Sequence, residues 1–205
     1  MSNNDTNVKH TNFTRLVLRL LRKDLFVYLR GTFIAELIDK TLWIGFVSFV
    51  VTHIMTKMGM PLEYGFFYST GLLMAVPFWS TWDDSVEVFS DWEGANSFGY
   101  YSILPIPFYL YLFQRMLFYV IKSLILCFCI APVLLTILIG RCSFTEASLF
   151  KFVIISVVAL FFCASLTFLV CALSKNSKSL GHVCTRIILP AWFVGGIQYS
   201  WYSVN

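Results

Sequence analysis

Apolar positions along the chain gather in five long runs that short polar stretches separate. The runs cover about residues 41–57, 64–82, 108–140, 152–174 and 187–204. A helix of about 20 apolar residues is long enough to cross the hydrocarbon core of a bilayer. The pattern therefore predicts an all-α fold, a polytopic helical membrane protein with about five transmembrane helices in residues 41–205.

Ahead of the first run, residues 13–30 have a basic face on a helical wheel, while the other faces are mostly apolar. The basic positions are Arg15, Arg19, Arg22, Lys23 and Arg30. Such a helix before a first span is typical of one that lies in the headgroup layer against membrane lipid. We therefore expect residues 1–40 to form a cytoplasmic tail and an amphipathic interface helix, with a bend at Gly31. A plain basic flank with no lipid specificity fits the pattern equally well.

The stretch after the second run is acidic. It holds five of the chain's eleven acidic residues: Asp83, Asp84, Glu87, Asp91 and Glu93. Asp84 and Glu87 have the spacing of a capping box, and Gly94 suits a helix C-terminus. These signals predict a short acidic helix over residues 84–94, in water between two spans, where a partner can bind it.

Other local signals concern the remaining spans. Pro77 predicts a kink in the second span. Arg115 and Lys122 are seven residues apart, so they share a helix face and are expected to snorkel to the same interface. Residues 143–146 form another capping signal, and residues 175–186 are expected to be a polar segment in water.

Composition and charge add a class and an orientation. The chain is 58% hydrophobic and 13% charged, whereas soluble chains carry about 25% charged residues, so a soluble domain is excluded. With the N-terminus inside, twelve basic residues fall on the cytoplasmic side and three outside: Lys57, Arg141 and Lys151. The positive-inside rule then predicts a cytoplasmic N-terminus in the cell (inner) membrane, a cytoplasmic acidic helix and an outer C-terminus.

The chemistry that the chain lacks narrows its function. There is no G-x-x-x-x-G-K-[ST], so ATP hydrolysis is not expected of this chain. There is also no G-x-S-x-G or similar local catalytic motif, and a transport subunit rather than an enzyme is expected. No acidic residue falls in the middle of a predicted span, which argues against an ion-coupled carrier. The six cysteines form no C-x-x-C, so no metal site is expected. The net charge of +4 lies mostly outside the apolar runs and indicates lipid rather than nucleic acid as a partner.

Several segments, in this order, are similar to those of a known family. The basic helix comes first, then F-S-D-W-E-G followed by S-I-L-P-I-P, later L-S-K-N-S-K-S-L-G, and last L-P-A-W-F-V-G-G-I-Q-Y-S-W. Together they resemble the permease, or membrane subunit, of a type-2 ATP-binding-cassette (ABC) exporter.

That resemblance implies a homodimer or heterodimer of permeases with separate ABC ATPase subunits docked below, which would hold the ATP and Mg; this chain itself would bind no cofactor. It also implies a cytoplasmic coupling helix between spans two and three. The corresponding positions here are Asp84, Glu87, Asp91, Glu93 and Gly94. Glu93 and Gly94 match the family motif most closely. The family has six spans, so the sixth is expected to be missing from this sequence.

Two other classes remain open. One is a small membrane-embedded carrier or enzyme, which a required titratable residue within a span would favour. The other is an accessory membrane subunit without a transport path, which normal transport after removal of the acidic helix would favour.

Overall fold

In the computed structural model, residues 4–94, 99, 107–139 and 149–195 are described, and the elements within these ranges are all helices. They are α1 (Asn4–Gly31), α2 (Phe33–Phe49), the π-helix η1 (Val50–Met55), α3 (Leu62–Gly94), α5 (Phe108–Leu138), α6 (Leu149–Leu173) and α7 (Ser177–Val194). The predicted all-α class is therefore confirmed for this part of the chain. The break predicted at Gly31 is also confirmed, because α1 ends there and α2 begins at Phe33.

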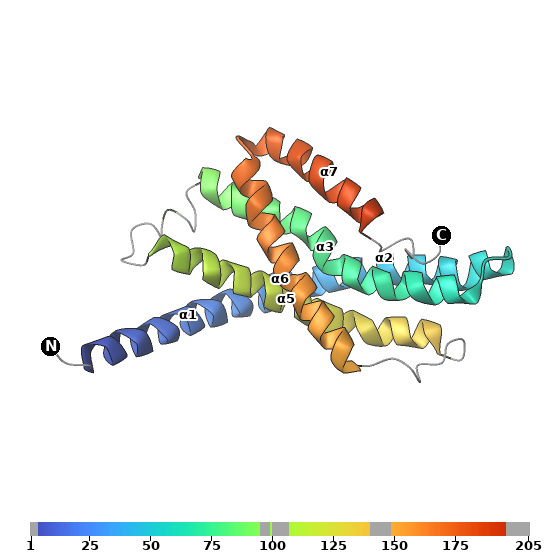
Figure 1. Ribbon diagram of the computed structural model, residues 1–205, viewed down its shortest axis with the longest axis horizontal. Coiled ribbons are helices and arrows are strands. Elements are labelled where there is room, and N and C mark those ends of the chain that lie inside the picture. The colour runs from blue at the N-terminus through green and yellow to red at the C-terminus, as the bar shows by residue number, and fades with distance from the viewer. Residues whose placement is uncertain (1–3, 95–98, 100–106, 140–148, 196–205) are drawn as a thin grey trace.

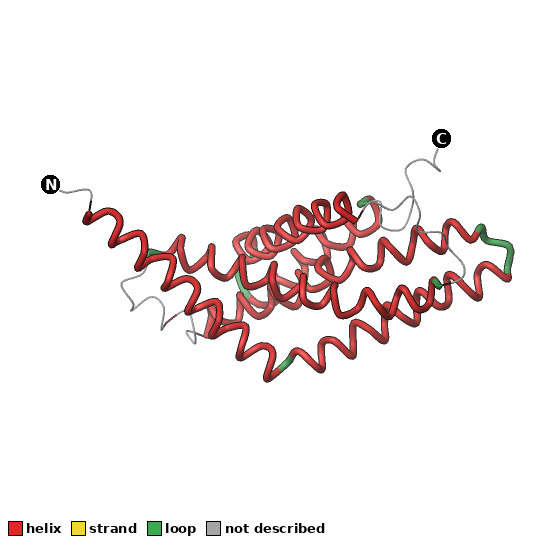
Figure 2. The backbone as a smooth tube through the Cα atoms, turned by 90° about the horizontal axis from the view of Figure 1, so that it is seen from below, coloured by secondary structure: helices red, strands yellow, loops and turns green. Residues whose placement is uncertain are grey.

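Helix α3 occupies the centre of the arrangement. It packs against α2, α5, α6 and α7, while α1 packs against α5 and α2. Leu72 and Leu126 are fully buried where α3 and α5 contribute to the core, and α7 adds Ile188. The N-terminal part of α1 extends from the bundle at one end, and the connection between α2 and α3 lies at the opposite end (Figures 1 and 2).

Much of the outer surface is apolar. On α6, Ile155, Val158 and Phe162 are each more than half exposed. A helix that is apolar all round and still exposed would place a large hydrophobic surface in water, whereas lipid would accommodate it. Two helical segments, Phe108–Leu138 and Val153–Leu173, are long and apolar enough to cross a bilayer. These features favour a membrane location; the number of spans stays a prediction.

The acidic helix predicted to begin at Asp84 is not a separate element. Helix α3 runs without a break from Leu62 to Gly94, and Pro77 lies inside it. Figure 1 shows α3 changing direction along its length, as an internal proline favours. The predicted helix start is wrong because the helix continues: Val88 and Phe89, beyond Asp84, are buried in the same core as the second apolar run.

A second correction concerns residues 175–186, which were expected to be a polar segment in water. Helix α7 begins at Ser177, and Leu180 and Cys184 are buried in the core. The Asn176 side chain accepts the backbone N–H of Ser179, and the Ser179 hydroxyl accepts that of Asn176, which forms a capping box. The expected capping signal at residues 143–146 and the end of the fifth run, residues 196–204, lie outside the described residues.

Candidate functional site: a buried charge cluster

Seven charged side chains from four helices meet in the bundle, and we call them the charge cluster. They are Asp24 of α1, Glu36 of α2, Asp84, Glu87 and Asp91 of α3, and Arg115 and Lys122 of α5. Removing a charge from water is costly unless it is paired and hydrogen-bonded. The contacts of the two cations show how the cluster meets this cost.

Lys122 is the centre of one half of the cluster. Its Nζ lies 2.8 Å from Asp84 Oδ1 and 3.3 Å from Glu36 Oε2. The Tyr28 hydroxyl donates to the same Glu36 oxygen at 3.0 Å, and Lys122 Nζ lies 5.2 Å from the centre of the Tyr28 ring. One ammonium thus joins α5 to α2 and α3, and the Tyr28 ring adds α1.

Arg115 is the centre of the other half. Its Nη2 lies 2.9 Å from Asp91 Oδ2, and its Nη1 lies 3.8 Å from Glu87 and 4.0 Å from Asp24. The side chain of Gln114 donates to Asp24 at 2.8 Å. The guanidinium can serve several carboxylates because it carries five N–H donors in a fixed fork.

Helical spacing explains why the two halves form together. Asp84 and Asp91 are seven residues apart on α3, as Arg115 and Lys122 are on α5, so each pair lies on one helix face. Asp84 pairs with Lys122 and Asp91 with Arg115, which is the register of two antiparallel helices. The predicted snorkelling is wrong: Arg115 and Lys122 are only 8% and 6% exposed, because carboxylates inside the bundle provide closer partners than the interface does.

Asp84 is the member of the cluster whose protonation is most affected. It lies beyond the apolar part of α3, residues 64–82, yet it is only 3% exposed. Burial raises the pKa of its carboxyl to about 7, since Lys122 opposes this effect only in part and the carboxylates of Glu87 and Glu36 add to it. The cluster can therefore hold or release a proton near neutral pH at this atom.

Of the five residues predicted to contact a partner, three are exposed at least in part and two face the interior of the bundle. Glu87 is half exposed, and Glu93 and Gly94 are exposed at the end of α3. Asp84 and Asp91 instead face α5 within the charge cluster. Glu93 also accepts the backbone N–H of Ser177, at 3.2 Å, where α7 begins.

The five residues predicted to contact lipid share one property. Arg15, Arg19, Arg22, Lys23 and Arg30 are all exposed along α1. The same helix turns Asp24 inward to Arg115. The helix thus presents basic side chains outward while it joins the charge cluster on its inner side.

Sequence reasoning missed the contributions of Asp24 and Glu36. A usable signal was present: two cations in an otherwise apolar helical run need partners, and these had to come from other helices. Within the described residues, Glu36 Oε1, Gln114 Oε1 and the Tyr119 hydroxyl are buried without a hydrogen-bond partner. In the same part of the chain, no group of three or more His, Cys, Asp or Glu side chains is placed to hold a metal ion.

Comparison with protein-family models, curated proteins and solved structures found no match to this chain. The likeness to ABC exporter permeases rests on the sequence motifs alone.

Proposed function

We propose that this chain is a membrane-spanning permease subunit of an ABC exporter. It lies in the cell membrane with a cytoplasmic N-terminus and five spans, and forms a translocation path together with a second permease subunit. A separate ATPase subunit binds ATP and Mg and drives the path between its access states. The end of α3 receives that subunit's motion.

The charge cluster is the observation that carries this proposal. A coupling element has to pass a displacement at one point to several helices at once. The cluster joins the last third of α3 to α1, α2 and α5 through charge-assisted contacts as short as 2.8 Å. Such contacts between buried groups are strong and directional, so the four helices respond to a push as one unit.

The outer side of the same α3 segment supports docking. Glu87 and Glu93 expose carboxylates there, and Gly94 lets a partner approach the backbone closely. Exposed charges at the rim of an interface speed and orient association with an oppositely charged surface. Asp84 and Asp91 transmit motion, the exposed carboxylate of Glu93 binds, and the half-exposed Glu87 takes part in both.

Cross-linking in native membranes tests this proposal. From a cysteine-free variant, Gly94→Cys is compared with Lys57→Cys, which lies near the opposite end of α3. We expect Gly94→Cys, but not Lys57→Cys, to cross-link to a polypeptide that a photoreactive ATP analogue labels. Glu93→Lys, a change outside the charge cluster, should reduce this product several-fold. Equal cross-linking at both positions, or ATP hydrolysis that scales with the purified chain alone, would overturn the proposal.

A proton-coupled carrier is the second candidate, and one observation favours it. Lys122 lies within the apolar run of α5 and pairs with the titratable Asp84 of α3, and ionisable residues in such a run often mark proton pathways. For such a carrier, transport in proteoliposomes would need no ATPase subunit, and Asp84→Asn would abolish its dependence on a pH gradient. An ABC permease reconstituted alone would show no such transport.

A further inference from the structure

A cavity of about 650 Å³ opens between α2 and α3. Its lining includes three indole side chains and three carboxylates. These are Trp43, Trp79, Trp82, Glu36, Asp39 and Asp83. A volume of this size is within the range of small-molecule sites, about 300–1,000 Å³.

We propose that this cavity binds a lipophilic organic cation, such as an aryl phosphonium or a quaternary ammonium compound. Indole rings attract cations to their faces through the ring quadrupole, and this attraction grows when water is excluded. Carboxylates beside the rings add direct charge attraction. An aromatic wall opposite carboxylates therefore selects a ligand that is both apolar and positively charged.

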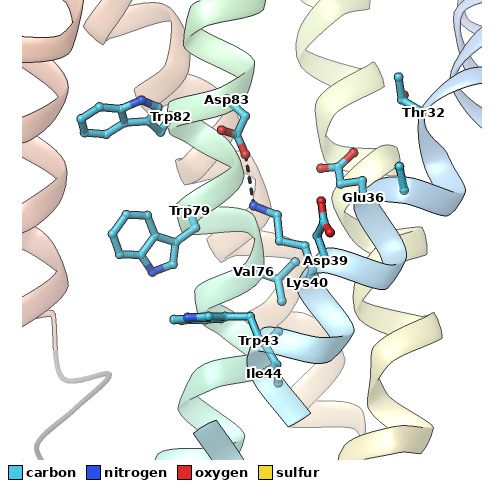
Figure 3. A pocket seen from close by; sticks show the side chains of 11 residues that line it. Thr32, Glu36, Asp39, Lys40, Trp43, Ile44, Val76, Trp79, Trp82 and Asp83 are labelled. Carbon is cyan, nitrogen blue, oxygen red and sulfur yellow. Dashed lines mark hydrogen bonds and ion pairs between the residues drawn. The ribbon is translucent and has the colours of Figure 1, made fainter. Parts of the chain in front are cut away.

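The arrangement of the side chains supports this choice. In Figure 3 the indoles of Trp79 and Trp82 lie on one side and the carboxylates of Glu36 and Asp39 on the other. The rings also contact each other: the ring centres of Trp43 and Trp79 are 6.5 Å apart and their planes meet at 73°, which is an edge-to-face contact. Trp79 also contacts Trp192 of α7, with ring centres 5.3 Å apart, so the aromatic wall is fixed from behind.

The charges in the cavity are unbalanced toward the acidic side. Lys40 is the cation in the lining, and its Nζ is 3.1 Å from Asp83 (Figure 3). Glu36 directs Oε2 to Lys122 in the charge cluster, while its Oε1 is buried and has no hydrogen-bond partner among the described residues. Asp39 is exposed. Lys40 thus lies where an added cation would be attracted, and it acts as an internal competitor.

Equilibrium binding to the purified full chain in detergent tests the site. Tetraphenylphosphonium is the probe, and tetraphenylborate, of the same shape and opposite charge, is the matched control ion. We expect saturable binding of the phosphonium alone. Trp79→Ala and Asp39→Asn should each weaken it by about threefold to thirtyfold, and Lys40→Met should strengthen it. Trp92→Phe, a tryptophan change on α3 outside the cavity, should leave it unchanged.

Asp39→Asn keeps the test decisive if Trp79→Ala disturbs folding, because the Asp39 side chain is exposed. Equal binding of the two ions would mean partition into apolar surface, and would overturn the proposal. If the single variants Asp39→Asn and Lys40→Met both bound tetraphenylphosphonium with the wild-type affinity, the proposal would also be overturned. The assay contains no ATPase subunit, so its outcome is independent of the exporter proposal.

Discussion

Asp84 and Lys122 are both nearly inaccessible to solvent, and each limits the cost of burying the other. Breaking a buried pair costs stability when the remaining charge is left without a partner, but Lys122 would keep Glu36 if the Asp84 charge were removed. Here Lys122 serves two carboxylates, Asp84 and Glu36, so the group holds more acid than base. The raised pKa of Asp84 agrees with this excess.

The pKa of Asp84 predicts a pH dependence of stability. Its carboxyl has a pKa of about 7 in the folded chain against an ordinary value of 3.8. The folded state therefore holds this proton more tightly than the unfolded state does. The contribution of Asp84 to the free energy of unfolding is fully present below about pH 4 and is lost as the pH rises through about 7. Asp84→Asn should match the wild type at pH 4 and be more stable by a few kcal/mol at pH 8. Thermal unfolding in detergent measures this.

Asp83→Asn is the matched control for that measurement. The Asp83 side chain is 61% exposed beside Lys40, and exposed ion pairs contribute only about 0–1 kcal/mol. We expect its difference from the wild type to change little with pH. A difference between Asp84→Asn and the wild type that is the same at pH 4 and pH 8 would contradict the prediction.

For single residues, the sequence showed which side chains are charged but not which other side chains they pair with in the fold. Asp84 and Glu87 have the three-residue spacing of a capping box at a helix start. Two residues on one face of an unbroken helix have the same spacing, so the sequence alone cannot tell the two cases apart. Lys122 lies 38 residues away from Asp84, so its pairing depends on how α3 and α5 pack. That packing is set by the whole core and is not encoded near either residue.

Among the elements, α3 and η1 approach unusually closely where Gly65 faces Thr52. A Cβ atom added at Gly65 would lie 3.2 Å from both the Cα and the Cγ2 of Thr52. The Thr52 backbone is held within a π-helix, and its hydroxyl donates to the Ser48 carbonyl at 2.6 Å. Glycine at this position allows the close contact between the two elements.

Gly65→Leu should therefore destabilise the chain by about 1–3 kcal/mol, the usual cost of overpacking. Gly181→Leu in α7 is the control, since a Cβ there would meet nothing within 4 Å, and leucine favours helix more than glycine does. We expect the control to be neutral or slightly stabilising. Melting temperatures in detergent decide the matter, and an equal loss in both variants would show that the contact with Thr52 is not the cause.

The existence of most helices could be predicted from sequence, while several of their ends could not. The apolar runs at 108–140 and 152–174 correspond to α5 and α6, because long apolar runs need internally paired backbone. The start of α7 was missed, although Asn176 and Ser179 carry its capping box. Polar residues 175–186 resembled a loop because only some of them, such as Cys184, face the core.

For the whole molecule, the asymmetry of basic residues predicts which ends of the helices lie in the cytoplasm. Starting from a cysteine-free variant, Met60→Cys in the α2–α3 connection and Gly94→Cys at the far end of α3 are treated with an impermeant thiol reagent. We expect labelling at Met60→Cys, but not at Gly94→Cys, in intact cells. After the membrane is permeabilised, both should react, which controls for accessibility. The reverse pattern in intact cells would overturn the orientation.

At the same scale, the central place of α3 was not readable from sequence. Its contacts with α2, α5, α6 and α7 arise because buried side chains occur on several of its faces, including Leu72, Val76 and Val88. Periodicity shows that a helix is apolar on many faces but not which neighbours cover them. The candidate site, which needs four helices, was hidden from sequence for the same reason.

The charge cluster also bears on how the chain enters a membrane during synthesis. An isolated α5 would carry Arg115 and Lys122 into lipid, where unpaired cations are costly. All five carboxylates of the cluster come earlier in the chain than these two residues. Ribosomal synthesis therefore delivers the anions first, and α5 can leave the translocon directly against waiting partners. Deletion of α1 to α3 should then lengthen the time for which α5 is retained at the translocon.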